Sequence, residues 1–256
     1  MGPSDAPSPP PSTEPGDRPT AATSPWKLAT VQEIRPETTR ASTFRLQVPD
    51  ATRHLPGQHY VVRLRAPDGY VAQRSYSVAS APDDSGMIEL TVERLEDGEV
   101  SGYLHDGVEV GDQLEVRGPL GGWFVWTGEQ PALLIGGGSG VVPLMSMLRF
   151  ARATGRSDLV RLVVSVRTPG DLLYADELPG PETTIVHTRV APPGADRAAG
   201  RLSGEDLSMI LPTPIGDGTT VYLCGSGGFA DAASQLLLQL GVPAERIRVE
   251  RFGPTG

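Results

Sequence analysis

The sequence predicts a two-domain protein in which an antiparallel β-barrel is followed by an α/β domain with a parallel sheet. Two patterns carry this prediction. Between Trp26 and Trp126, short alternating runs are separated by Gly, Pro and Asp, which is typical of a barrel or a sandwich. From Gln130 onward, compact apolar runs alternate with helical patterns, which is typical of a doubly wound parallel sheet.

In the first half, alternation and turn residues define the expected elements. Side chains of an extended chain alternate between two faces, and Pro67-Asp68-Gly69 and Asp97-Gly98 are turn signals. The expected strands are 41–48, 59–65, 71–80, 87–95 and 113–118, with a short helix or turn over 101–105.

In the second half, the period of the apolar residues changes from strand to helix repeatedly. The expected strands are 132–136, 159–166, 184–190, 220–225 and 246–252, and the expected helices are 141–154, 171–178, 203–211 and 228–240. Ser203 is a suitable N-cap for the third helix. Ligands of such a sheet bind at the carboxyl ends of its strands.

Composition sets the domain limits and excludes several classes of protein. Residues 1–25 are rich in Pro and Ser and are expected to form a disordered tail, before domains over 26–126 and 127–256. No signal-peptide core or membrane span is apparent, so a cytoplasmic location is expected. The net charge of −9 argues against a nucleic-acid partner. A single cysteine, Cys224, excludes an internal disulfide and a cysteine-ligated cluster, and the four histidines lack metal-ligand spacing.

The tetrapeptide Arg74-Ser75-Tyr76-Ser77 places three useful groups on one strand. Alternation puts Arg74 and Tyr76 on one face, and Ser75 and Ser77 on the other. A guanidinium can fork onto a pyrophosphate, a phenol ring can lie against an isoalloxazine, and a hydroxyl can bind a ring nitrogen. The tetrapeptide therefore suits a flavin, although the same residues are common in ordinary strands.

Glycines follow two strands of the second half. Gly136 to Gly140 lie between the strand 132–136 and the helix after it, where backbone N–H groups can receive a phosphate. The pattern is neither G-x-G-x-x-G nor a P-loop, yet its context favours dinucleotide binding over a plain turn. Cys224-Gly225 ends the strand 220–225, where the reacting ring of a nucleotide would lie. The alternative for Cys224 is a buried, purely structural side chain.

Taken together, these motifs resemble the ferredoxin–NADP reductase superfamily. The resemblance is carried by Arg74 to Ser77, Gly138 to Pro143, Leu223-Cys224-Gly225 and Val249 to Phe252, in the family's order, and it covers residues 26–256. It implies a flavoprotein in which FAD takes a hydride from a nicotinamide and releases single electrons.

The resemblance also implies roles for individual residues. FAD would be held by the R-x-Y-[ST] motif and by a second phosphate turn, in which Val100 stands where some members carry Cys. The FAD residues are then Arg74, Ser75, Tyr76, Ser77, Val100, Ser101 and Phe252. Phe252 corresponds to the aromatic that shields the flavin in plant-type members, but here Gly253 to Gly256 follow it, so the shielding role does not carry over directly.

The nicotinamide site is expected at the strand ends of the second half. Its residues are Gly138, Ser139, Gly140, Val141, Pro143, Arg167, Thr188, Arg189, Cys224 and Gly225. Arg167 ends the second strand of this half, where an Asp or Glu would grip an unphosphorylated ribose. Thr188-Arg189 ends the next strand and resembles the family's [ST]-R phosphate site, so both strand ends favour NADPH over NADH. The residues expected to line hydride transfer are Ser77, Cys224 and Glu250.

The predicted function is therefore that of an NAD(P)H-dependent flavoprotein reductase. Its acceptor is expected to be a ferredoxin, a flavodoxin, an oxygenase component or a small molecule, and the chain is expected to be a monomer. Two alternatives within reach are a flavin reductase and a flavin-binding electron-transfer subunit of a larger complex. A serine hydrolase is disfavoured because neither Ser139 nor Ser226 lies in G-x-S-x-G.

Overall fold

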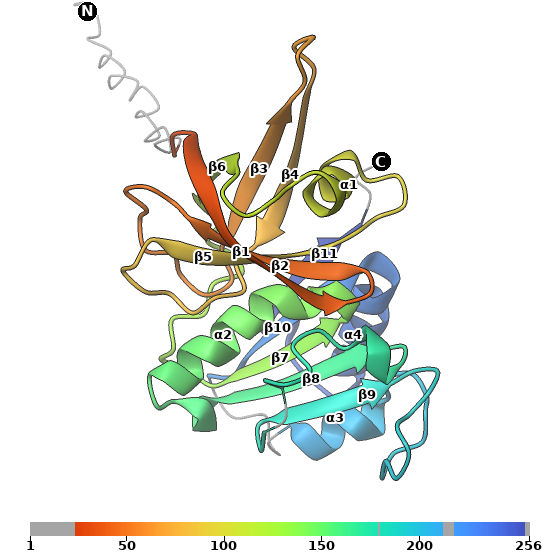
Figure 1. Cartoon of the computed structure of the whole chain (residues 1–256). Helices are drawn as coiled ribbons and strands as arrows, with labels where there is room; N and C mark the ends of the chain where they lie inside the picture. Colours follow the sequence, from red (N-terminus) through yellow and green to blue (C-terminus); the bar gives the residue numbers. More distant parts are fainter. Residues whose placement is uncertain (1–23, 179, 212–217, 254–256) are drawn as a thin grey trace, which may run out of the picture.

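A computed structural model describes residues 24–178, 180–211 and 218–253. Most of the expected tail (1–23), together with Pro254, Thr255 and Gly256, lies outside these ranges. The described chain forms a β-barrel stacked on an α/β layer (Figure 1). No helix in the described part is both long and apolar enough to cross a bilayer.

The first domain is a six-stranded antiparallel sheet in the order β4-β3-β6-β1-β2-β5. An antiparallel bridge from Val78 to Leu90 joins its two edges and closes the barrel. The barrel interior is apolar, with Phe44, Leu46 and Tyr60 almost fully buried. The elements are β1 Lys27–Thr38, β2 Ala41–Gln47, β3 His59–Arg65, β4 Val71–Ser77, β5 Met87–Glu93, α1 Glu99–Asp106 and β6 Gln113–Leu120.

The second domain is a five-stranded parallel sheet in the order β11-β10-β7-β8-β9. Its first strand lies in the centre, so the chain reverses its direction of winding beside β7. The strands are β7 Ala132–Gly137, β8 Val160–Val166, β9 Thr183–His187, β10 Thr220–Ser226 and β11 Ile247–Phe252, and the α-helices are α2 Val141–Ala153, α3 Gly204–Ile210 and α4 Gly227–Gln239. Short 3₁₀ turns occupy Gly138–Gly140, Ser157–Leu159, Pro169–Asp171 and Ala244–Arg246.

Helices cover both faces of the parallel sheet, as the doubly wound prediction requires. Helix α2 packs in one apolar cluster that also includes Ala41 and Ala79 of the barrel, so α2 lies between sheet and barrel (Figure 1). Helices α3 and α4 contribute Leu207 and Leu237 to a separate cluster on the opposite face. The predicted fold class, an antiparallel barrel followed by a parallel α/β domain, is confirmed.

One predicted helix is wrong. Residues 171–178 form a 3₁₀ turn followed by irregular turns, not a helix. Tyr174 has φ +56°, in the left-handed region that a helix cannot contain. Its backbone N–H donates to Glu37 Oε2 of the barrel at 3.1 Å, and its hydroxyl donates to Thr91 Oγ1 at 2.6 Å. Contacts with the other domain therefore override the apolar spacing of this segment.

Other differences concern the strands. Strand β1 was not predicted, because its inward positions Ala29 and Val31 give way to alternating charges and Pro36, with shifts of register against β2. Two predicted strands are too long, because β4 ends at Ser77 and β9 at His187. The remaining elements agree with the predicted ranges within a few residues, and Ser203 caps α3 by accepting from the N–H of Asp206 at 3.2 Å.

Candidate active site

The carboxyl end of β4 carries the expected flavin motif, and Figure 1 shows this end directed toward the α/β domain. Arg74 lies opposite Val62, and Tyr76 lies opposite Tyr60, both of which belong to the barrel core. Directly opposite residues of antiparallel strands share a face. Arg74 and Tyr76 therefore share one face, as predicted, and Ser77 lies on the other.

Arg74 is free to bind an anion. Its side chain is exposed, and its Nη1 donates only to the carbonyl of Gln73, at 2.8 Å. Within the described ranges no carboxylate lies at ion-pair distance from it. The positive charge of Arg74 acts on the neighbouring hydroxyls of Tyr70 and Tyr76, where it opposes the rise in pKa. In Tyr76 burial wins and raises the pKa to about 12, so this phenol stays neutral.

The second expected phosphate turn is the start of α1. Val100 and Ser101 are buried in its first turn, after Gly98, and no side chain caps this end. The hydroxyl of Ser101 is committed, because it donates to the carbonyl of Gly98 and accepts from the N–H of Leu95, each at 3.2 Å. Any contact to a phosphate at this position therefore comes from backbone N–H groups, which the first turn leaves without helical partners.

The glycine-rich turn lies where the winding of the sheet reverses. Gly138, Ser139 and Gly140 form a 3₁₀ turn between β7 and α2, with Val141 and Pro143 in the first turn of the helix. A Cβ at Gly140 would lie 2.2 Å from the carbonyl oxygen of Cys224 and 2.7 Å from the Cα of Gly225. The turn after β7 is thus pressed directly against the end of β10, and only glycine permits this approach.

The substitution Gly140→Ala is expected to destabilise the α/β domain and to weaken nicotinamide binding. The new methyl group meets backbone atoms, which cannot rotate away, so we expect a cost of about 1–3 kcal/mol. Gly228→Ala is the matched control, since no atom lies within 4 Å of a Cβ placed there. Urea unfolding of both variants measures the difference, and equal midpoints for the two would contradict the steric argument.

Cys224 and Glu250 are neighbours across β10 and β11, in parallel register. Cys224 is fully buried, and burial, with the nearby charge of Glu250, raises the pKa of its thiol well above 9.0. Burial also raises the pKa of Glu250 to about 7, and its Oε2 is buried without a hydrogen-bond partner among the described residues. The pair thus offers a neutral thiol and a carboxyl group that can hold a proton near neutral pH.

The raised pKa of the Glu250 carboxyl predicts a specific pH dependence of stability. Its pKa rises from 4.5 to about 7 on folding. The folded state therefore holds more protons between these values, so the stabilisation is full below pH 4.5 and is lost as the pH rises through 7, by about 3 kcal/mol. Glu250→Gln should show a correspondingly smaller fall in the free energy of unfolding between pH 5 and pH 8. Parallel pH profiles for variant and wild type would contradict a raised pKa.

The residues expected to bind the 2′-phosphate of the nicotinamide dinucleotide also lie close together. Arg167 follows β8, and Thr188 and Arg189 follow β9. The N–H of Arg189 donates to the carbonyl of Arg167 at 2.9 Å, so the two residues are backbone neighbours at adjacent strand ends. In the described part of the chain neither guanidinium has an ion-pair partner. This cationic pair lies at the carboxyl edge of the sheet, the edge that also carries the glycine-rich turn.

Arg197, in the loop that precedes α3, makes structural contacts within the α/β domain. It forms an ion pair with Asp206 at 2.6 Å and donates to the carbonyls of Ala198, Gly200 and Arg201. Its hydrogen bonds lower the pKa of Asp206 to about 2.

Phe252, at the end of β11, is half-buried against the cluster that contains Cys224.

Sequence reasoning missed the polar contacts between the two domains. A pocket of about 360 Å³ opens between the barrel and α2, and none of the predicted site residues lines it. Its walls include Arg35, Arg45, Glu89, Arg149 and Glu177. These charges lie far apart in the sequence, and single charged residues on amphipathic elements carry no signal that they meet.

Comparisons with known families agree with this arrangement. Residues 25–125 match the model of the oxidoreductase FAD-binding domain, and residues 134–235 match that of the oxidoreductase NAD-binding domain. The two matches cover the barrel and most of the α/β domain.

Two curated relatives are components of monooxygenase systems. The chain is 31% identical over 234 residues to the reductase component of propane 2-monooxygenase from Rhodococcus jostii, covering 87% of this chain and 62% of that protein. It is 34% identical over 212 residues to the glycine betaine monooxygenase reductase subunit of Chromohalobacter salexigens, covering 78% and 56%. The chain thus spans less than two thirds of the length of these relatives.

Among solved structures, the chain resembles the flavohaem-like FAD/NAD-binding domain of nitric oxide dioxygenase from Vibrio cholerae. The TM-score is 0.78 at 26% identity, and the alignment covers 89% of this chain and 99% of that domain. The likeness therefore extends to the pairing of both domains.

Proposed function

The chain belongs to the family of oxidoreductases in which an FAD-binding domain precedes an NAD-binding domain, and from this we propose that it is an NAD(P)H-dependent reductase that passes electrons to a separate oxygenase component. The observation that supports the proposal most is the junction at Gly140, where the glycine-rich turn meets the strand end that carries Cys224 beside Glu250. A dinucleotide laid on that turn would bring its reacting ring to these two side chains.

The residues present fit an FAD. The guanidinium of Arg74, which has no carboxylate partner in the described ranges, can receive its pyrophosphate, and so can the N-terminus of α1, which no side chain caps. The half-buried ring of Tyr76 offers a flat apolar face. Ser77, which is 5% exposed, can donate a hydrogen bond to the flavin ring from the end of β4. When bound, FAD supplies the chemistry that accepts a hydride and releases its two electrons one at a time.

The protein's part is to orient the reactants and to keep water away. Cys224 packs in an apolar cluster and can limit the space beside the nicotinamide without reacting, because its thiol stays protonated. Glu250, with a pKa of about 7, can hold or release a proton at Oε2, which has no hydrogen-bond partner among the described residues. Positioning of this kind accounts for several kcal/mol of a barrier when both rings are held in reach.

NADPH is the proposed donor. Arg167 and Arg189, backbone neighbours at adjacent strand ends, lack carboxylate partners in the described ranges, and guanidinium groups bind a phosphate in a forked geometry. Thr188, which directly precedes Arg189, adds a hydroxyl group to this site. A ribose without the 2′-phosphate would leave the guanidinium groups of Arg167 and Arg189 without an anionic partner.

The proposed acceptor is the oxygenase component of a multi-component system, by analogy with the two relatives. Because the solved neighbour belongs to a nitric oxide dioxygenase, a haem protein is the second candidate. A flavin reductase is less favoured, since Arg74 and the start of α1 offer a binding site for the FAD phosphates that a released flavin does not need. A monomeric state and a cytoplasmic location stay predictions, which light scattering and cell fractionation would check.

One preparation tests the proposal. The purified protein should be yellow with about one FAD per chain, and anaerobic NADPH should bleach it at a lower concentration than NADH. Reduced protein should then be reoxidised by an oxygenase component or ferredoxin faster than by free flavin. A protein that binds no FAD overturns the proposal, and preferential bleaching by NADH overturns the assignment of Arg167 and Arg189.

A further inference from the structure

Helix α2 serves both halves of the candidate active site. It begins at Val141, directly after the glycine-rich turn, and its side that faces the barrel carries Ser146 and Arg149. Arg149 lies eight positions after Val141, which is about 12 Å along the helix. Helix α2 therefore connects the glycine-rich turn directly with the barrel.

The helix binds the barrel just after the serine expected at the flavin. The hydroxyl of Ser146 donates to the carbonyl of Ser80 at 2.7 Å, and Nη1 of Arg149 donates to the carbonyl of Ala79 at 3.0 Å. Ala79 and Ser80 follow Ser77 by two and three residues. The glycine-rich turn expected to hold the nicotinamide and Ser77, expected at the flavin, are therefore connected through α2 and residues 78–80.

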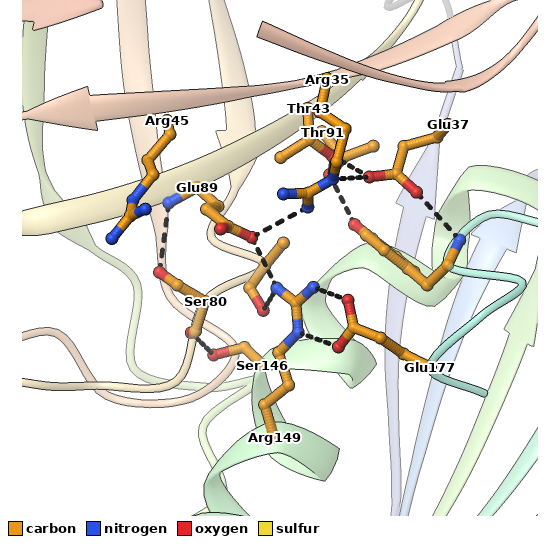
Figure 2. Close-up of polar contacts among 12 residues, drawn as sticks. Arg35, Glu37, Thr43, Arg45, Ser80, Glu89, Thr91, Ser146, Arg149 and Glu177 are labelled. Carbon is orange, nitrogen blue, oxygen red and sulfur yellow. Dashed lines mark hydrogen bonds and ion pairs between the residues drawn. The ribbon is translucent and has the colours of Figure 1, made fainter. Parts of the chain in front are cut away.

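Arg149 also joins two carboxylates from different domains (Figure 2). Its Nη1 lies 2.8 Å from Glu89 Oε2 of β5, and its Nε lies 2.9 Å from Glu177 Oε2 of the α/β domain. The side chains of Arg149 and Glu89 are only 15% and 17% exposed, so water screens this pair weakly. The guanidinium plane can therefore turn little without breaking a bond.

Glu89 in turn fixes the segment that Arg149 holds. Its N–H donates to the hydroxyl of Ser80 at 3.1 Å, and its carbonyl accepts from the N–H of Ala79 at 2.8 Å. Residues 79 and 80 are thus held from β5 on one side and from α2 on the other. Figure 2 shows the contacts of Ser80 with Glu89 and Ser146. Movement of α2 relative to the barrel must displace the chain that leads to Ser77.

We propose that Ser146 and Arg149 are positioning residues that set the separation between the nicotinamide and the flavin. The proposal rests on the proposed reductase function. It is distinct from a general contribution to stability, because the two side chains contact the backbone next to Ser77 and neither is expected to touch a cofactor.

The same helix supplies a matched control. Arg152, one turn after Arg149, donates from Nε to Glu182 at 2.8 Å and from Nη1 to the carbonyl of Glu177 at 2.7 Å. All of these partners belong to the α/β domain. Arg152→Met therefore removes an arginine of the same helix without removing a contact to the barrel.

The test compares Arg149→Met, Ser146→Ala and Arg152→Met as holoproteins. In Arg149→Met and Ser146→Ala, we expect the limiting rate of flavin reduction by NADPH to fall about tenfold, with the Kd values for FAD and NADPH unchanged. A displacement of about 1 Å can cost 10²-fold, so a tenfold loss corresponds to a smaller shift. Hydrogen–deuterium exchange of residues 78–80 should accelerate in both variants and stay unchanged in Arg152→Met.

The outcomes separate this inference from the function on which it rests. If neither NADPH nor NADH reduces the FAD of the wild type, the proposed function is wrong. If the wild type is reduced and both variants keep its limiting rate and its exchange at residues 78–80, the positioning role is wrong. Equal losses of rate in all three variants would indicate a general loss of stability and would also overturn it. Ser146→Ala removes one hydroxyl, so it gives a result even if Arg149→Met folds poorly.

Discussion

Arg74→Ala protein is expected to be purified with little or no FAD. The guanidinium is exposed, has no carboxylate partner within the described ranges, and lies on the same face of β4 as Tyr76. A hydrogen bond to a charged group contributes about 1.5–3 kcal/mol, so the Kd for FAD should rise about 10- to 100-fold. Titration of the apoprotein with FAD, followed by quenching of flavin fluorescence, measures the change.

Arg65→Ala is the control for this prediction. Arg65 is an exposed arginine of the adjacent strand β3, and its Nε lies 3.3 Å from Glu115. Its loss should leave FAD affinity unchanged, because an exposed ion pair contributes little and Arg65 has no place in the candidate site. If the two variants bind FAD equally well, Arg74 does not hold the pyrophosphate.

Cys224→Ala is expected to retain its yellow colour and to slow flavin reduction by about 10²-fold. Cys224 lies at the carboxyl end of β10, pressed by Gly140 on one side and paired with Glu250 on the other. Removing its sulfur leaves room for the nicotinamide ring to shift, and a small misplacement of a reacting pair costs about this much. Stopped-flow reduction under anaerobic conditions gives the limiting rate directly.

A purely structural role for Cys224 makes a different prediction. Its burial among apolar side chains would then matter only for stability, and the rate would not change. Val221→Ala, at a fully buried position three residues earlier on the same strand, supplies the comparison. Both variants should lose stability, but only Cys224→Ala should lose rate. An unchanged rate in Cys224→Ala would remove this residue from the site.

The sequence predicted those parts of the molecule whose signals are local. The alternation of Arg74 to Ser77, the glycine-rich turn before α2 and the cap at Ser203 each depend on neighbours in the chain, and the structure shows all three. The segment 171–178 failed for the opposite reason. Its apolar spacing suits a helix, but the contacts of Tyr174 with Glu37 and Thr91 lie more than 80 residues away in sequence.

The candidate site was partly predictable for the same physical reason. Strand order in a parallel sheet brings the ends of neighbouring strands together, so the meeting of Arg167 with Arg189 followed from recognising the strands. The buried Oε2 of Glu250 and the hydrogen bonds of Arg149 depend on packing between elements. No local sequence pattern predicts such packing.

Helix α2 packs on the parallel sheet and also binds the barrel through Ser146 and Arg149, which has a consequence for protein engineering. A chain built from an FAD-binding and an NAD-binding domain invites exchange of its nucleotide-binding half, with the cut placed in the segment between β6 and β7. Here such a cut would separate Arg149 and Tyr174 from Glu89, Thr91 and Glu37, their partners in the barrel. A working chimera would have to take β5, residues 79–80 and Glu37 of β1 from the same parent as α2 and Tyr174. The exchangeable unit therefore includes parts of both domains.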